Sequence, residues 1–260
     1  MAAEALATGR GLQRVEAVMG IPVGIDVRDD GVDPAALDRA FAHLHAVDAA
    51  FSTYRAGSDV SRIAAGTLAP RDARPEVRAV LARCEDLRRE TGGRFDVRAT
   101  GRLDPSGFVK GWAVDGAVAI LRAAGARNLC VHAGGDVRVL GERAPGLPWR
   151  IGVQHPLARR SVAAVLQAPA TGLSVATSGA YERGDHIVDP RTGRPPRGVL
   201  SVTVAGPDLG PADAYSTAAF AMGGAGPAWT ATLAAHAALT ILASGRVLST
   251  RGMTALRADA

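Results

Sequence analysis

The 260-residue sequence is poor in cysteine, aromatic residues and lysine. Its two cysteines, Cys84 and Cys130, lie in no CxxC motif and are too few for a disulfide framework, so we expect both to be small core residues. No stretch of about 18 apolar residues occurs, which excludes a membrane-spanning helix. No Cys/His cluster has zinc spacing, and the GxGxxG, GxxxxGK[ST] and GxSxG motifs are missing. Classical dinucleotide-binding and P-loop folds are therefore disfavoured.

The composition is that of a globular protein, with 47% hydrophobic and 21% charged residues. The net charge is +5, but the basic residues are scattered, which disfavours a nucleic-acid-binding surface and leaves anionic small molecules as candidate ligands. Among the 30 basic residues, Lys110 is the single lysine. The first twenty residues contain neither an apolar signal region nor a cysteine for a lipid anchor, so we expect a cytoplasmic protein.

Hydrophobic periodicity and turn signals predict an interleaved series of strands and helices. Helices are expected at 34–50, 60–65 (capped by Asp59 and Ser61), 75–90, 108–124, 212–222 and 226–236. Strands are expected at 13–28 (broken by Gly20 and Pro22), 128–132, 136–140, 149–154, 162–168, 173–177, 186–188 and 199–205, and a closing hairpin at 238–248. Because this order is no regular βαβ alternation, the sequence predicts an α+β fold with a mostly antiparallel sheet and packed helices.

The single lysine lies at the start of an expected helix, after the turn Asp104–Gly107. A cation in the first turn of a helix opposes the helix dipole, at a cost of about 0.3–1 kcal/mol. That cost disappears if an anion binds at the same helix N-terminus, where free N–H groups attract phosphate. Lys110 is therefore either a phosphate ligand or a solvated surface residue.

Asp213 and Thr217 are four residues apart, so they share one face of the expected helix 212–222. A carboxylate and a hydroxyl are hard oxygen ligands that suit Mg²⁺. The alternative is that Asp213 caps the N-terminus of an alanine-rich helix.

A third motif is the turn Asp189–Gly193 (DPRTG), in which aspartate accepts backbone N–H bonds, proline fixes φ and glycine adopts the left-handed conformation. His186 precedes this turn on an expected strand and is either a general base or a polar core residue. Two weaker signals are Gly-Gly pairs. One lies in Thr91–Asp96, between a helix end and an expected strand, and the other in Gly134–Asp136, where it permits close backbone approach to a ligand.

Taken together and in order, these segments resemble the ApbE family of FAD:protein FMN transferases. The segments that carry the resemblance are Met19-Gly20, Phe51–Arg55 with Ser61-Arg62, Thr91–Asp96, Asp104–Ala113, Gly134–Asp136, His186–Gly193 and Ala212–Thr217. The resemblance spans residues 15–253, which we expect to form a single domain between a flexible N-terminus (1–14) and a C-terminal tail (254–260). It implies an α+β fold related to the tunnelling folds, with FAD as the donor and Mg²⁺ as the metal.

The resemblance also implies roles for individual residues. The metal ligands would be the backbone carbonyl of Gly107 with Asp213 and Thr217, and His186 would be the catalytic residue. The residues that match FAD-contacting positions are Met19, Tyr54, Arg94, Phe95, Asp96, Asp104, Lys110 and Ile187. The implied partner is an acceptor flavoprotein with a Ser or Thr flavinylation site.

In the implied reaction, a Ser or Thr hydroxyl of the acceptor attacks the flavin-side phosphorus of FAD and AMP leaves, while Mg²⁺ neutralises the phosphate charge. Two alternatives use the same residues. One is an Mg²⁺-dependent FAD pyrophosphatase, in which water replaces the hydroxyl, and the other is a non-catalytic FAD-binding protein.

Overall fold

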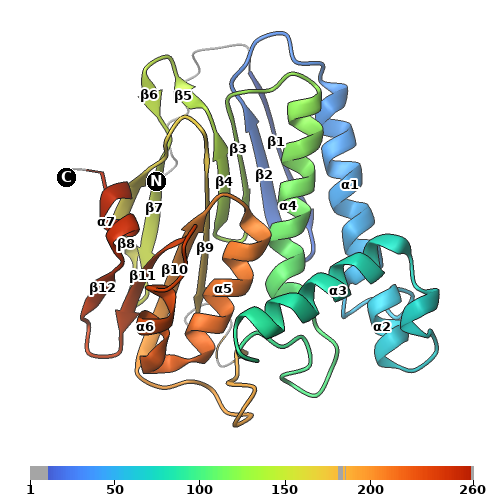
Figure 1. Cartoon of the computed structure of the whole chain (residues 1–260). Helices are drawn as coiled ribbons and strands as arrows, with labels where there is room; N and C mark the ends of the chain where they lie inside the picture. The colour runs from blue at the N-terminus through green and yellow to red at the C-terminus, as the bar shows by residue number, and fades with distance from the viewer. Residues whose placement is uncertain (1–10, 181–183, 185, 259–260) are drawn as a thin grey trace.

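The computed structural model describes residues 11–180, 184 and 186–258. Eight strands form one sheet in the order β1-β2-β3-β4-β9-β10-β11-β12, and every neighbouring pair in it is antiparallel (Figure 1). Its strands are β1 (Leu12–Val18), β2 (Ile21–Val27), β3 (Leu129–Ala133), β4 (Asp136–Leu140), β9 (Leu173–Gly179), β10 (Val199–Gly206), β11 (Ala237–Leu242) and β12 (Val247–Ser249). Two further antiparallel pairs join β5 (Glu142–Ala144) to β6 (Leu147–Pro148) and β7 (Arg150–His155) to β8 (Ala158–Gln167).

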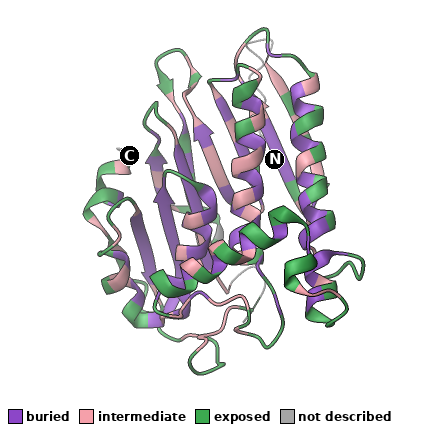
Figure 2. Ribbon diagram, turned by 45° about the vertical axis from the view of Figure 1, so that its right-hand side comes forward, coloured by how far each residue is buried: buried purple, intermediate pink, exposed green. Residues whose placement is uncertain are grey.

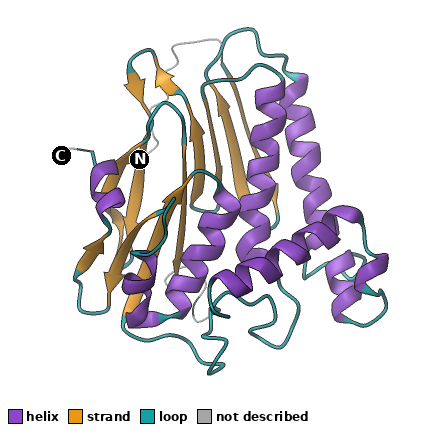
Figure 3. Ribbon diagram, viewed as in Figure 1, coloured by secondary structure: helices purple, strands orange, loops and turns teal. Residues whose placement is uncertain are grey.

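Helices α1, α4 and α5 lie along one face of the sheet, as Figure 3 shows. The helices are α1 (Ala35–Phe51), α2 (Asp59–Ala64), α3 (Pro75–Glu90), α4 (Ser106–Ala123), α5 (Leu209–Ala221), α6 (Gly226–Thr230) and α7 (Arg251–Leu256), with short 3₁₀ turns η1 (Pro70–Asp72) and η2 (Gly223–Ala225). Within the described parts of the chain, no helix combines the length and the apolar character that crossing a bilayer requires.

Strands β9, β10 and β11 are buried on both faces of the sheet, and they appear mostly purple in Figure 2. The larger core lies between the sheet and the helices and includes Phe41, Leu44 and Leu121. The smaller core lies on the opposite face, where β7, β8 and α7 supply Ile151, Leu166 and Met253. Burying these apolar side chains is the main driving force for the fold.

The predicted α+β class and the antiparallel sheet are confirmed, but four local predictions are wrong. Residues 186–188 form no strand, because the N–H of His186 donates to the carbonyl of Gly184 in a local turn. No strand follows Thr91–Asp96 either, since the N–H of Phe95 donates to Oγ1 of Thr91.

The other two errors concern helix ends. The helix expected at 226–236 ends at Thr230, where the N–H of Thr232 donates to the carbonyl of Trp229 three residues earlier and the chain turns. The cap of α2 is Ser58, whose side chain accepts the N–H of Ser61, so Asp59 and Ser61 are not the caps. Residues 1–10 of the predicted N-terminal segment and 259–260 of the predicted tail lie outside the described residues, and the domain boundaries stay a prediction.

Several turns meet at one end of the sheet. The β1–β2 turn at Met19-Gly20 and the β3–β4 turn at Gly134-Gly135 lie there, because the start of β2 pairs with the end of β3. The start of β4 pairs with β9, so β9 also ends on this side, at Gly179. The N-terminal part of α4 also reaches this end, where Lys110 contacts Asp136. The turns that carry the sequence motifs are thus placed around one candidate site.

Candidate functional site

The site is built on two antiparallel helices, α4 and α5, that approach each other closely. A Cβ at Gly111 would lie 2.5 Å from the carbonyl oxygen of Leu209, so this position accepts no larger side chain without movement of the backbone. At Gly107 a Cβ would lie 3.2 Å from Oγ1 of Thr217. The close contact brings Gly107 and Lys110 of α4 next to Asp213 and Thr217 of α5.

Lys110 lies between two buried carboxylates. Its Nζ is 2.6 Å from Oδ2 of Asp136 and 3.7 Å from Oδ2 of Asp213. Because α4 begins at Ser106, Lys110 is the fifth residue of the helix and not part of its first turn. The interpretation of Lys110 as a solvated surface residue is wrong, since its ammonium pairs with carboxylates that are almost fully buried.

Asp213 occupies the interior of α5, which begins at Leu209, so it is not an N-terminal cap. Burial raises the pKa of Asp213, the ammonium of Lys110 lowers it in part and the neighbouring charge of Asp136 raises it, so that the resulting pKa is about 8. Two buried acids share one ammonium, so both can be ionised at the same time only where a further cation balances the second charge.

This second acid, whose charge Lys110 alone does not balance, is the observation that tests whether a cation fits. The Oδ2 atoms of Asp136 and Asp213 are buried and accept no hydrogen bond of normal geometry within the described structure, although both face Lys110. The same described residues hold no group of three or more His, Cys, Asp or Glu side chains positioned for a metal. A hard divalent cation would therefore need carboxylate, hydroxyl and carbonyl oxygens together, which is the ligand set that Mg²⁺ prefers. The residues fit such an ion.

Hydroxyl groups surround Thr217. Oγ of Ser178, at the end of β9, lies 3.3 Å from Oγ1 of Thr217 and 2.8 Å from Oγ of Ser216. Ser216 in turn donates to the carbonyl of Asp213 at 2.9 Å, which leaves its hydroxyl oxygen as an acceptor for Ser178. This chain of hydrogen bonds orients the Thr217 hydroxyl from the sheet side.

The loop after α3 closes another side of the site. The ring of Phe95 is buried next to Gly107, and its Cε2 lies 3.4 Å from the point that a Cβ would occupy at that glycine. Arg94 forms an ion pair with Asp189, at 3.3 Å between Nη1 and Oδ2. The Asp189–Gly193 turn has the predicted form, because Asp189 accepts the N–H of Arg191 and Gly193 has a φ of +66°. Two segments about ninety-five residues apart are thus joined.

The remaining predicted residues are less closely gathered. Tyr54 is 96% exposed on the turn after α1, and His186 is exposed with its Nδ1 3.0 Å from the carbonyl of Gly184. Ile187 packs against the larger core. Asp96 and Asp104 each accept a backbone N–H two residues further on, which makes them turn-forming residues whatever else they bind.

Met19 is the non-glycine residue with a left-handed backbone among the described residues, with a φ of +55° in the two-residue β1–β2 turn. Such a conformation costs a residue with a long side chain free energy and is concentrated at functional sites. The side chain packs at the edge of the larger core. This strained turn lies at the same end of the sheet as Asp136.

Sequence reasoning missed Asp136 and Ser178 as site residues. In the sequence, Gly134–Asp136 stands out for the close approach that its glycines permit, yet its aspartate is the nearest partner of the single lysine. A carboxylate directly after a Gly-Gly hairpin was the available signal. Ser178 carried none, since its role depends on the pairing of β9 with its neighbours.

The antiparallel fold and the site between α4 and α5 define an α+β protein with a candidate divalent-cation site. The model of the ApbE family matches residues 19–101 and 97–240, and this chain belongs to the ApbE family.

The chain is similar to curated proteins named FAD:protein FMN transferase. One from Rhodobacter capsulatus is 39% identical over 163 residues, which is 59% of this chain and 31% of that protein. One from Vibrio cholerae is 37% identical over 131 residues, which is 46% of this chain and 39% of that protein. The chain thus spans about a third of the length of these curated relatives.

Two solved structures share the fold over nearly the whole chain. The ApbE protein from Thermotoga maritima is 24% identical with a TM-score of 0.84, covering 96% of this chain and 100% of that one. The apo flavinyl transferase ApbE from Pseudomonas stutzeri is 22% identical with a TM-score of 0.84, covering 98% and 99%.

Proposed function

We propose that this protein transfers the FMN half of FAD to a Ser or Thr hydroxyl of an acceptor flavoprotein and releases AMP. The observation that carries the proposal is the position of Lys110 on α4, between the buried carboxylates of Asp136 on β4 and Asp213 on α5. Membership in the ApbE family and the names of the curated relatives support the same activity.

In this proposal, Asp213, Thr217 and the carbonyl of Gly107 would hold Mg²⁺. When bound, the ion supplies charge neutralisation for the pyrophosphate of the donor. Asp136 was not among the expected ligands. Its buried oxygen lies next to Lys110, so Asp136 and Asp213 form one cluster of acids around this lysine. Lys110 would bind a phosphate oxygen while remaining oriented by Asp136.

The flavin donor would lie along the turns that surround this centre. We propose contacts from Met19, Tyr54, the Arg94–Asp96 loop, Asp104 and Ile187. The ion pair of Arg94 with Asp189 supports this arrangement, because it holds the loop after α3 against the turn that follows His186. The exposed ring of Tyr54 is available for stacking on a flat ligand.

His186 is the proposed base. A carbonyl oxygen accepts only, so the hydrogen bond to Gly184 assigns the proton to Nδ1 and leaves the lone pair on Nε2. Nε2 would accept the proton of the acceptor hydroxyl as its oxygen bonds to the flavin-side phosphorus. The bond from that phosphorus to the AMP oxygen breaks, and AMP leaves.

The test is release of AMP from FAD and Mg²⁺, with and without a small flavoprotein domain that exposes a threonine. A transferase releases AMP only with the acceptor, which gains the mass of FMN. AMP release without the acceptor identifies a pyrophosphatase, and FAD binding without AMP release identifies a binding protein. Either of the last two results contradicts the proposal.

A further inference from the structure

Asp115 connects the middle of α4 to the first turn of α5. Its Oδ1 accepts the N–H of Leu209 at 3.0 Å, and its Oδ2 accepts the N–H of Gly210 at 2.9 Å. These are the first two residues of α5, whose N–H groups have no partner within the helix. A carboxylate at this position also interacts favourably with the helix dipole. Asp115 therefore caps α5 from a neighbouring helix.

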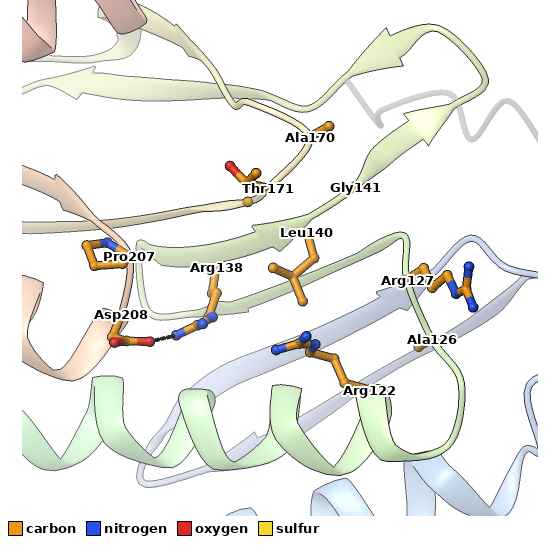
Figure 4. A pocket seen from close by; sticks show the side chains of 11 residues that line it. Arg122, Ala126, Arg127, Arg138, Leu140, Gly141, Ala170, Thr171, Pro207 and Asp208 are labelled. Atoms are coloured by element: carbon orange, nitrogen blue, oxygen red, sulfur yellow. Dashed lines mark hydrogen bonds and ion pairs between the residues drawn. The ribbon is translucent and has the colours of Figure 1, made fainter.

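Asp208 is at the ordinary N-cap position of α5, but its side chain binds another residue. Asp208 precedes α5 and makes no side-chain cap hydrogen bond, because its carboxylate pairs with Arg138 at 2.9 Å. Figure 4 shows this pair in the wall of a surface groove, next to Pro207. The same Nη1 of Arg138 also forms a close ion pair with Asp115. Arg138, on β4, is thus the counter-ion of the carboxylate that caps α5.

Because the Asp115 carboxylate is mostly buried, its charge depends on its hydrogen-bond and ion-pair partners. The Asp115 and Arg138 side chains are mostly buried, with 20% and 12% of their area exposed. Burial raises the pKa of Asp115, and the charge of Arg138 with the two N–H groups of α5 lowers it only in part. A carboxylate that is held on three sides in this way has one orientation, which makes it a precise anchor.

Three contacts follow each other along the α4–α5 pair. Asp115 binds the start of α5, Lys110 faces Asp213 one turn further on, and Gly107 faces Thr217. Sliding α5 by one residue would move Asp213 by about 1.5 Å along the helix axis. The contact between Asp115 and α5 fixes this axial position.

We propose that Asp115, with Arg138 as its counter-ion, is a positioning residue that fixes the register of α5 and thereby places Asp213 and Thr217 for the metal. The inference rests on the proposed function, because it assigns the role through the metal site. The Asp115 side chain binds Leu209, Gly210 and Arg138, none of which is a proposed metal ligand. Its loss would act on metal affinity through the placement of α5.

The variant Asp115→Asn tests this role, because the amide keeps the shape but turns one acceptor into a donor that faces an N–H group or Arg138. We expect Mg²⁺ binding, measured by calorimetry on the FAD-free protein well below the Tm, to weaken by about 10–100-fold. FAD affinity measured in EDTA should change by less than twofold. Turnover should recover at saturating Mg²⁺, so the loss appears in the Mg²⁺ requirement and not in kcat.

The matched control is Asp208→Asn, which removes an acidic partner of the same arginine but no hydrogen bond to Leu209 or Gly210. It should bind Mg²⁺ within twofold of wild type. Should Asp115→Asn not fold, Arg138→Gln keeps the capping carboxylate and removes its counter-ion, and it should weaken Mg²⁺ binding in the same direction.

The outcomes separate the two proposals. Wild-type protein that binds no Mg²⁺ overturns the metal site and this role together. Wild-type binding with an Asp115→Asn dissociation constant within twofold overturns the positioning role alone, even where the Tm falls, because a purely structural residue would lower the Tm without moving metal affinity.

Discussion

Replacing Lys110 with alanine removes the ammonium that Asp136 and Asp213 share. Their side chains are 2% and 5% exposed, so water cannot replace the lost partner. Removing one partner of a buried ion pair costs about 3–5 kcal/mol. Since Lys110 itself is 23% exposed, we expect the lower end, about 3 kcal/mol. For a domain of this size, that lowers the Tm by roughly 6–12 °C.

The assay is urea unfolding in EDTA and again with Mg²⁺. Two carboxylates without an ammonium attract a divalent cation more strongly, so Mg²⁺ at about 100 times its Kd should restore about 2.7 kcal/mol. Arg122→Ala, at an exposed position near the end of the same helix, should change stability by less than about 0.5 kcal/mol. If Lys110→Ala unfolds in EDTA at the wild-type urea midpoint, the ammonium does not stabilise the buried carboxylates of Asp136 and Asp213, and the reasoning is refuted.

Further variants test the chemistry and the core. Lys110→Arg keeps the charge, but we expect weaker FAD binding in a fluorescence titration, because a planar guanidinium does not fit a site that holds a compact ammonium. Asp213→Ala should abolish Mg²⁺-dependent turnover while circular dichroism stays native, and wild-type activity at micromolar Mg²⁺ would refute the metal assignment. His186→Ala should lower kcat by roughly 10²–10⁴-fold and spare FAD affinity, whereas an unchanged rate would leave this exposed histidine without a catalytic role. Burial raises the pKa of Cys84 and Cys130 to about 12, so their reactive thiolate forms are scarce at pH 8 and only unfolded protein should react with a thiol reagent; rapid labelling of native protein would contradict this.

The fold was predictable where local signals decide the structure. The amphipathic stripe from Leu37 to Phe51 predicts α1, and α3 ends at Glu90 as predicted, with Thr91 as its C-cap before two left-handed glycines. Predictions failed where a polar side chain redirects the backbone. Thr91 accepts the N–H of Phe95 and prevents a strand there, and just after the end of α6 at Thr230 the hydroxyl of Thr232 donates to the carbonyl of Trp229. Such hydrogen bonds leave no periodic signature in the sequence.

The candidate site was predictable on α4 and α5 but not on the sheet. Asp213 and Thr217 share a helix face because of their spacing alone. Asp136 joins them only through the pairing of β3 with β4 and the packing of α4 over that end of the sheet. Asp115 is equally hidden, since the two N–H groups that it accepts, those of Leu209 and Gly210, lie more than ninety residues away. Long-range partners of this kind are fixed by tertiary structure.

Two electrostatic effects act on Lys110, the helix dipole and the pairing with two buried acids, and they differ in size. From the sequence, the helix dipole disfavours a cation in the first turn by about 0.3–1 kcal/mol. In the structure the lysine lies past the first turn, where the dipole effect has declined, and removing its ammonium would leave two buried acids without their cation, at a cost several times larger. An arginine there would present a planar, forked group to two carboxylates at 2.6 Å and 3.7 Å from a single atom. The two acids of this chain therefore already favour a compact ammonium at this position. A bound phosphate would be one more anionic neighbour of Nζ of Lys110.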